Sequence, residues 1–314
     1  MLRTPRNRSE NLNRANPSNT KVSSQQQTVL WVLWLTYGSF YFCRTNISAA
    51  LPGMEQELGY SKAELGTVLM SLKLAYGVGQ FVNGQLAERL GPRKLLAIGL
   101  LGSAVLNVFF GWFTSLYFLT FVWACNGYVQ ALGWPSTMRV AANWFQASNR
   151  GRAIGIIGTG YQLCGVLSFF LSGWAADRFG WRGAFYVPAV LVGASAIHML
   201  LFLKDTPKDP KPAPDQVVAL GPAHSFRANI LDTLSNPSLW LVALALYLLD
   251  ACRYGFTDWG IAHLKEVQDI EVSTAAYKLA VLPLGGIAGS RKLVWARAAS
   301  TALRRSSALA VLAT

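Results

Sequence analysis

Charged side chains are scarce in this chain of 314 residues. Asp, Glu, Lys and Arg make up 14% of the sequence, whereas an ordinary soluble domain carries about 25%. Hydrophobic residues make up 52%, and long runs with almost no charge alternate with short clusters of Arg and Lys. This distribution excludes an ordinary water-soluble domain and predicts an all-α polytopic membrane protein.

Acidic residues are the scarcer charged type, with 15 Asp and Glu against 28 Lys and Arg and a formal net charge of +13. The basic residues fall in the N-terminal tail, in short loops and near the end of the chain, and they form no basic face interleaved with aromatics. We therefore expect no nucleic-acid partner. Basic loops of a membrane protein are typically cytoplasmic, so the N-terminus is predicted to be cytoplasmic.

Residues that carry catalysis or bind metals are also few. The sequence has three histidines and four cysteines, and it contains no GxSxG, P-loop or HExxH motif. The cysteines show no CxxC spacing and fall inside apolar segments, so we expect packing positions rather than disulfides or metal ligands. The sequence predicts neither an enzyme nor a cofactor or metal site.

The sequence is rich in apolar segments, each close to the roughly 20 residues that cross a bilayer as a helix. The predicted spans are Thr28–Leu51, Leu65–Leu86, Leu95–Phe113, Leu116–Val140, Ala153–Ala176, Gly183–Leu203 and Ser238–Ala262, with an eighth beginning near Thr274. The first six predict an N-terminal six-helix bundle over 28–203, and the start of a second bundle follows over 238–290. The polar residues 1–27 predict a disordered cytosolic tail, and the Pro-rich residues 204–237 predict a cytosolic linker.

The segment 291–314 fits no membrane element. It carries five basic residues, no acidic residue and no further full span. We interpret it as an atypical tail that follows a truncation, with an out-of-frame reading as the hypothesis. A chain with one complete bundle is expected not to transport by itself, because half of the cavity wall would be absent.

An internal repeat joins two turns. "GQLAERLGPRK" (84–94) follows the second span and "GWAADRFGWRG" (173–183) follows the fifth, and both read G-x-x-A-acid-R-x-G-x-R. Three-helix units repeated with inverted topology would place the turns on opposite sides of the membrane; chance similarity of two Gly-rich turns is the alternative. The candidate structural residues are Gly84, Glu88, Arg89, Gly91, Arg93, Asp177 and Arg178.

Arg44 and Arg253 lie well inside predicted spans. No acidic residue occurs between Thr28 and Met54, yet Arg44 lies between them, where a charge costs about 2.5–3.5 kcal/mol on insertion scales. Arg253 lies in the seventh span, and each arginine follows a cysteine. If the bundles are related by pseudo-symmetry, the two guanidiniums face one cavity and suit a phosphate.

Each arginine also has a structural interpretation. Arg44 could snorkel or form an ion pair. Asp250 precedes Arg253 by three residues, on the same helical face. This pair could neutralise Arg253 until an anion displaces the carboxylate, or it could mean that the site does not bind phosphate.

The turn "GQLAERLGPRK" resembles the loop between the second and third helices of the major facilitator superfamily. "GWPSTMRVAANWFQASNRGRAIGI", "LKDTPKD" and "CRYGFTDWGIAHLKEV", with the stretch around Arg44, further resemble the organophosphate:phosphate antiporter family. The resemblance implies a major facilitator fold, here the first bundle plus the first one or two helices of the second. It also implies a charge latch at Glu88, Arg89 and Arg93. The phosphate-binding positions that it implies are Arg44 and Arg253, with the cavity tyrosines Tyr37, Tyr41 and Tyr76.

The sequence departs from that family at two positions. Gln80 stands where members commonly have a lysine, and Tyr161 stands where many have a histidine. Lys73, seven residues before Gln80, could compensate or could serve packing or gating. These changes leave the substrate open.

The expected function is secondary active transport, in which an organic phosphate such as glycerol-3-phosphate or a sugar phosphate exchanges for inorganic phosphate by rocker-switch alternating access. The alternatives are a membrane sensor of sugar phosphate and a transporter of a non-phosphorylated organic anion or drug-like molecule. We expect a monomer in the lipid bilayer, in the cell (inner) membrane if the source is bacterial.

Overall fold

The computed structural model describes residues 23–207 and 234–286, apart from the side chains of residues 85, 87–89 and 148. The described residues form helices and no strands, which confirms the all-α prediction. The elements are α1 (Ser24–Ser39), η1 (Phe40–Cys43), α2 (Ile47–Leu58), α3 (Lys62–Leu90), α4 (Pro92–Trp112), α5 (Leu116–Gln130), α6 (Gly133–Trp144), α7 (Ala147–Phe179), α8 (Gly183–Phe202), α10 (Pro237–Gln268) and α11 (Val272–Leu279). Residues 281–286 are also helical.

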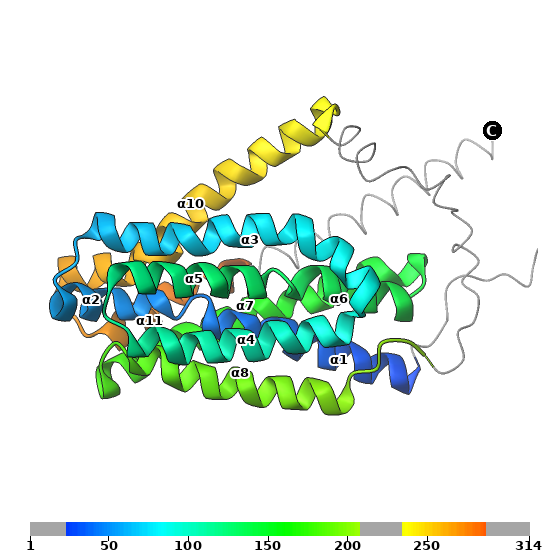
Figure 1. Cartoon of the computed structure of the whole chain (residues 1–314), viewed down its shortest axis with the longest axis horizontal. Helices are drawn as coiled ribbons and strands as arrows, with labels where there is room; N and C mark the ends of the chain where they lie inside the picture. Colours follow the sequence, from blue (N-terminus) through cyan, green and yellow to red (C-terminus); the bar gives the residue numbers. More distant parts are fainter. Residues whose placement is uncertain (1–22, 208–233, 287–314) are drawn as a thin grey trace, which may run out of the picture.

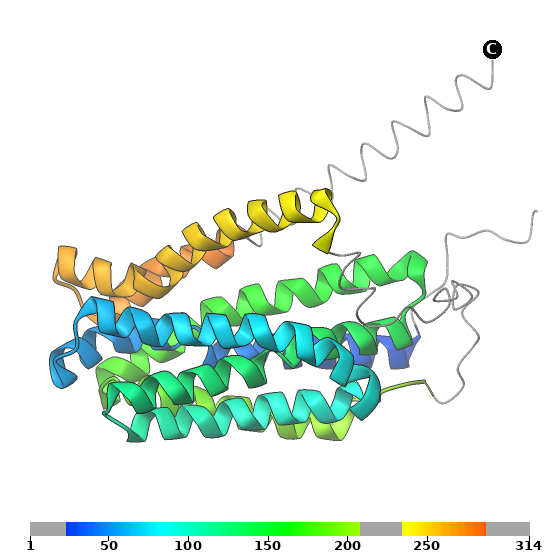
Figure 2. The ribbon, with the colours of Figure 1, turned by 45° about the horizontal axis from the view of Figure 1, so that its top comes forward.

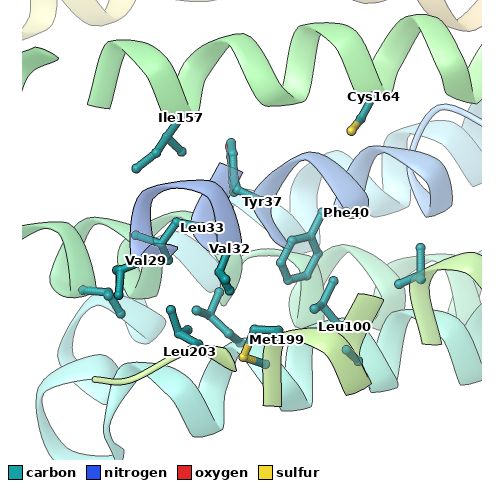
Figure 3. Close-up of a cluster of buried hydrophobic side chains, with 14 of the residues drawn as sticks. Val29, Val32, Leu33, Tyr37, Phe40, Leu100, Ile157, Cys164, Met199 and Leu203 are labelled. Atoms are coloured by element: carbon teal, nitrogen blue, oxygen red, sulfur yellow. The ribbon is translucent and has the colours of Figure 1, made fainter. Parts of the chain in front are cut away.

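Elements α1 to α8 form one bundle of roughly parallel and antiparallel helices (Figure 1). Helix α3 packs on α5, α4 on α8, and α1 on α7. Figure 3 shows part of the core, where Leu33 of α1 and Phe40 of η1 lie among Leu100 of α4, Ile157 of α7 and Met199 of α8, all fully buried. The buried stripe of α1 thus holds three neighbouring helices together through apolar packing.

Five described helices are long and apolar enough to cross a membrane, and they match the second, third, fifth, sixth and seventh predicted spans. The first and fourth predicted spans are each interrupted. The first is divided into α1, η1 and α2 around Arg44, and the fourth is divided between α5 and α6 at residues 131–132. Residues 24–27, predicted as tail, instead open α1, because Ser23 and Gln26 form a reciprocal capping box.

The two repeat turns lie at opposite ends of the bundle, as inverted topology requires (Figure 1). At the α3–α4 turn, Gly91 adopts a φ of 83°, and the Arg93 amide donates to Asp205 Oδ1 at 2.9 Å. The Arg93 guanidinium also donates to the carbonyl of Leu200 in the last turn of α8. At the α7–α8 turn, Asp177 accepts a hydrogen bond of 2.8 Å from the Ser273 amide at the start of α11.

The other motif positions divide into two groups. Gly84 lies within α3, and Arg178 is exposed in the last turn of α7. The side chains of Glu88 and Arg89 lie outside the described residues, as do 1–22, 208–233 and 287–314. The predicted latch at Glu88 and Arg89, most of the predicted tail and linker, and the atypical segment 291–314 therefore remain predictions.

Helix α10 contacts the bundle through its second half only. Residues 237–249 are all exposed, and this half stands away from the bundle in both views (Figure 2). The second half packs on α2 and α11, and α11 packs on α7. Where α11 meets α7, a Cβ at Gly173 would come within 2.7 Å of Ala276 Cβ, so the small residue permits this close approach.

Candidate functional site

A cavity of about 240 Å³ lies where the interruption of the first span meets α7, α10 and residues 281–286, and both Arg44 and Arg253 line it. The other lining residues are uncharged, and several are aromatic or polar, among them Tyr41, Thr45, Tyr161, Gln162, Phe169 and Tyr254. A larger, more open cleft of about 490 Å³ at the α7–α8 turn is lined by Glu57, Asp177 and Lys265. Its two carboxylates make it the poorer anion site, so we take the cavity of the two arginines as the candidate.

Arg44 lies where the first span leaves helical geometry. Its φ and ψ are −120° and −48°, so the carbonyl of Cys43 is directed away from the helix. That carbonyl accepts hydrogen bonds of 2.9 Å from the side-chain amides of Gln130 and Asn126, both on α5. Irregular backbone at membrane depth is tolerated where other protein groups satisfy it, and here two amides of one helix do so.

The Arg44 guanidinium is buried, with 8% of the residue exposed. Its Nε donates to Gln130 Oε1 at 2.7 Å, and its Cζ lies 4.7 Å from the ring centroids of Tyr41 and Tyr76. Its Nη2 is buried without a hydrogen-bond partner. The contacts to Arg44 that the structure describes are neutral, so its charge is stabilised by an amide and two aromatic faces and stays uncompensated.

Arg253 has a different environment. Its Nη1 lies 3.6 Å from Asp250 Oδ1, and the two side chains are 44% and 47% exposed. This confirms the ion pair predicted from the three-residue spacing. The guanidinium also lies 5.1 Å from the ring centroid of Tyr254.

The predicted tyrosines gather around Arg44. Tyr41 and Tyr161 stack with ring centroids 5.1 Å apart, and Tyr37 contacts each of them at 6.2 Å. Tyr41 and Tyr161 line the cavity, whereas Tyr37 and Tyr76 adjoin it from behind and are not among its lining residues. The structure thus brings all four predicted tyrosines into contact with Arg44 or with a ring that contacts it.

Besides Tyr37 and Tyr76, the predicted site residues Lys73 and Gln80 do not line the cavity. Lys73 forms an ion pair with Asp258 of α10, and its Nζ lies 4.8 Å from the ring centroid of Tyr254. This arrangement corresponds to the packing or gating interpretation of Lys73. Gln80 is partly buried, and its Nε2 has no hydrogen-bond partner.

Three residues that matter to this geometry were not predicted from the sequence. Gln130 binds Arg44, Tyr254 lines the cavity beside Arg253, and Asp258 pairs with Lys73. One signal was present, because Asn126 and Gln130 are polar residues four apart inside a predicted span and so share a helical face. Asp258 offered a similar signal as a carboxylate inside the seventh span.

The sequence matches the family model described as Major Facilitator Superfamily over residues 33–314. A "Probable hexose phosphate transport protein" of Chlamydia trachomatis is 29% identical over 287 residues, which cover 85% of this chain and 63% of that protein. The "Glycerol-3-phosphate transporter" of Bacillus subtilis is 29% identical, with 84% and 63% covered. The "Membrane sensor protein UhpC" of Salmonella typhimurium is 27% identical, with 85% and 63% covered. The chain therefore spans less than two thirds of the length of these relatives.

Solved structures give the same fold. A bacterial homologue of the human lysosomal transporter Spinster, inward-facing and unoccupied, has a TM-score of 0.69 at 21% identity, with 84% of this chain and 60% of that chain covered. A D-xylose-proton symporter has a TM-score of 0.56 at 14% identity, with 83% and 66% covered. These relatives are multi-pass membrane proteins rather than enzymes. From the family match and the shared helical architecture, the chain belongs to the Major Facilitator Superfamily.

Proposed function

We propose that the cavity binds the phosphate group of an organic phosphate, and that the protein exchanges this substrate for inorganic phosphate across the membrane. The observation that carries the proposal is the presence of two guanidiniums on one cavity, of which Arg44 has no described acidic partner. Guanidiniums bind phosphate oxygens through paired, charge-assisted hydrogen bonds. A bound anion would supply the missing counter-charge.

The names of the relatives support the proposed substrate class. Proteins named as hexose phosphate and glycerol-3-phosphate transporters match most of the chain. In the proposal, Tyr41 and Tyr161 donate their hydroxyls to the phosphate or to the organic part, and Arg253 joins the clamp when the anion displaces Asp250. Tyr37 and Tyr76 support the rings and the guanidinium from behind.

Exchange needs a cavity that opens to one side at a time. The second half of α10 is joined to the bundle by the Lys73–Asp258 pair and by a 2.5 Å Lys62–Glu266 pair, whereas the first half makes no such contact in the described residues. This asymmetry supports alternating access by rocking of the second bundle against the first. The Arg93 and Asp177 turns would then stabilise opposite ends of the bundle.

We further propose that the end of the bundle with the α3–α4 turn is cytoplasmic, in the cell (inner) membrane if the source is bacterial. The start of α1 lies at the same end as the basic α3–α4 turn and the end of α8 (Figure 1). Gln26 donates to the Trp144 carbonyl at the end of α6, Trp144 Nε1 donates to the Lys204 carbonyl, and Arg93 donates to Asp205, so these segments are linked to one another. Basic loops gathered at one end favour that end as cytoplasmic.

A membrane sensor is the second candidate, favoured by the match to a relative of that name. A sensor binds its ligand and signals through a partner without net exchange. Both functions use the same anion cavity, so binding alone does not separate them.

Phosphate counterflow tests the proposal. Proteoliposomes loaded with unlabelled phosphate are given labelled phosphate outside, with the 314-residue chain and with a version extended to the length of its relatives. The extended protein is expected to accumulate label, and glycerol-3-phosphate outside should compete. Phosphate binding without counterflow in the extended protein would indicate the sensor, and neither binding nor counterflow would contradict the anion cavity itself.

A further inference from the structure

We infer that Gln130 is the positioning residue of the anion site: its amide fixes the Arg44 guanidinium at the cavity and, because it is neutral, leaves the positive charge available to an anion. The consequence for anion binding rests on the proposed function, whereas the positioning of Arg44 by Gln130 rests on contacts that involve no ligand.

The contacts of Gln130 fix which end of the amide faces Arg44. Its Nε2 lies 2.9 Å from the Cys43 carbonyl, 3.2 Å from the Phe40 carbonyl and 2.9 Å from Ser103 Oγ. A carbonyl only accepts, so the nitrogen must face Cys43 and Phe40. The oxygen is therefore directed at Arg44, whose Nε donates to it at 2.7 Å.

The amide is itself held rigidly. Gln130 is fully buried, and Ser103 Oγ, which Gln130 contacts, also donates to Asn126 Oδ1 at 2.6 Å. Asn107 donates to the Ser103 carbonyl at 2.8 Å. A side chain whose polar atoms all have buried partners has little rotamer freedom, and a network of this kind specifies one arrangement.

The chemistry favours an amide over a carboxylate at this position. A glutamate would accept from Arg44 equally well, but it would neutralise the guanidinium and compete with an anionic substrate. It would also place an oxygen against the Cys43 carbonyl, where only a donor is satisfied. Glutamine is the residue that caps the broken helix, orients the arginine and adds no charge.

Asn126 provides a matched control. It caps the same Cys43 carbonyl at 2.9 Å from the same helix and is equally buried. It makes no described contact with Arg44. If Gln130 only capped the helix break, Asn126→Ala and Gln130→Ala would have the same consequences.

The test uses the chain in lipid nanodiscs with ¹⁵N-labelled arginine. The Arg44 Nε–H signal is assigned by its loss in Arg44→Lys, and its hydrogen exchange with water is measured without ligand. Gln130→Ala is expected to speed this exchange at least about tenfold because the buried acceptor is lost, and Asn126→Ala is expected to leave it near the wild-type rate. Equal rates in wild type and Gln130→Ala, or equal acceleration in both variants, would overturn the inference.

Gln130→Glu keeps the shape of the side chain and supplies a second readout if Gln130→Ala does not fold. A protonated carboxyl can donate to the Cys43 carbonyl as the amide does, whereas an ionised one cannot. Arg44 and the Cys43 carbonyl contact this position, and Tyr41 and Tyr76 contact the Arg44 guanidinium; these neighbours are the same in the variant and the wild type. The ratio of the phosphate dissociation constant of Gln130→Glu to that of the wild type therefore reports the effect of the introduced carboxyl alone.

The variant is expected to bind phosphate at least about tenfold more weakly than the wild type, because the carboxylate neutralises Arg44, and equal dissociation constants would contradict the assigned role. The two measurements separate the inference from the proposed function. If wild type binds no phosphate while Gln130→Ala alone accelerates Nε–H exchange, the proposed function fails and the positioning role stands.

Discussion

Arg44 and Arg253 line the same cavity, yet the protein holds them in opposite ways. Arg44 is buried and bound by a neutral amide at 2.7 Å. Arg253 is 44% exposed in its side chain and lies 3.6 Å from a carboxylate. An arginine that has a neutral partner keeps its charge for a ligand, whereas one that has an acidic partner must first exchange that acid for the ligand.

The difference assigns unequal parts to two residues that look equivalent in the sequence, since each follows a cysteine. In the proposed mechanism Arg44 is the constant part of the anion site, because it belongs to the first bundle. Arg253 lies on α10, whose first half stands away from the bundle (Figure 2), and it would be the part that moves with the second bundle. Anion binding that replaces Asp250 at Arg253 would join the two bundles through the substrate.

The largest effect is expected from Arg44→Lys. An ammonium keeps the charge but cannot bind Gln130 through Nε and grip an anion through a fork at the same time. Phosphate binding should weaken about 100-fold, measured as the phosphate dissociation constant in nanodiscs, and counterflow by the extended protein should stop. Arg253→Lys is the matched comparison and should weaken binding less. Undiminished exchange in Arg44→Lys would refute its role.

The next effect concerns Lys73, the third cation near the cavity. Its partner Asp258 is 18% exposed and Lys73 itself 32%. Lys73→Met leaves that carboxylate unpaired and should cost about 1–2 kcal/mol, less than for a fully buried pair. Thermal unfolding should show the loss, while the phosphate dissociation constant stays within about threefold of wild type.

Two control variants sharpen the Lys73 result. Lys73→Met combined with Asp258→Leu should recover stability, because no unpaired charge remains. Lys62→Met breaks an ion pair whose side chains are 48% and 61% exposed and should have the smaller effect. A large loss of phosphate affinity in Lys73→Met would instead place Lys73 in the anion site.

Asp250→Asn should have the opposite sign to Arg44→Lys. The substitution removes the negative charge beside Arg253 and keeps the size of the side chain at position 250. Phosphate should therefore bind about three- to tenfold more tightly. The gain is modest because the pair is half exposed and solvent already screens it. Competition by phosphate at several salt concentrations measures it. Weaker binding in Asp250→Asn would mean that Asp250 supports the site instead of blocking it.

The smallest effect is expected at an exposed pair of the same kind, far from the cavity. Arg182 Nη1 lies 2.6 Å from Glu57 Oε1, and this hydrogen bond lowers the pKa of Glu57 below its ordinary value. A lowered carboxyl pKa stabilises the fold above the unfolded-state value of about 4.3, and the contribution is lost as the pH falls through the folded-state value.

Glu57→Gln should therefore lower the melting temperature near pH 7 by about 1–2 °C at most, with no difference from wild type at a pH below both values. A difference that persists in acid would show that lost packing, rather than the ion pair, is responsible.

Much of the fold could be predicted from the sequence, because the length of an apolar segment indicates a membrane-spanning helix. The Arg253–Asp250 pair was also predictable, since its members are three residues apart on one helix. The break at Arg44 was not. The Gln130 amide that binds Arg44 there lies on another helix, 86 residues away in the sequence. The length of an apolar segment does not reveal such a contact.

The same reason explains why the sequence left two interpretations of Lys73 open. Its partner Asp258 lies 185 residues away, so the sequence could not tell a free cation from a paired one. Only the tertiary contacts distinguish Lys73 and Arg253, which have acidic partners, from Arg44, which has none among the described residues. Tertiary contacts also separate the two departures from the resembled family: Tyr161 lines the cavity, whereas Gln80 does not.

The most direct test of this account measures phosphate binding by three nanodisc samples side by side: wild type, Arg44→Lys and Asp250→Asn. The account predicts changes of opposite sign, with weaker binding when the uncompensated arginine is replaced and tighter binding when the competing carboxylate is removed. Dissociation constants that shift in the same direction, or that do not shift at all, would contradict the unequal roles of the two arginines.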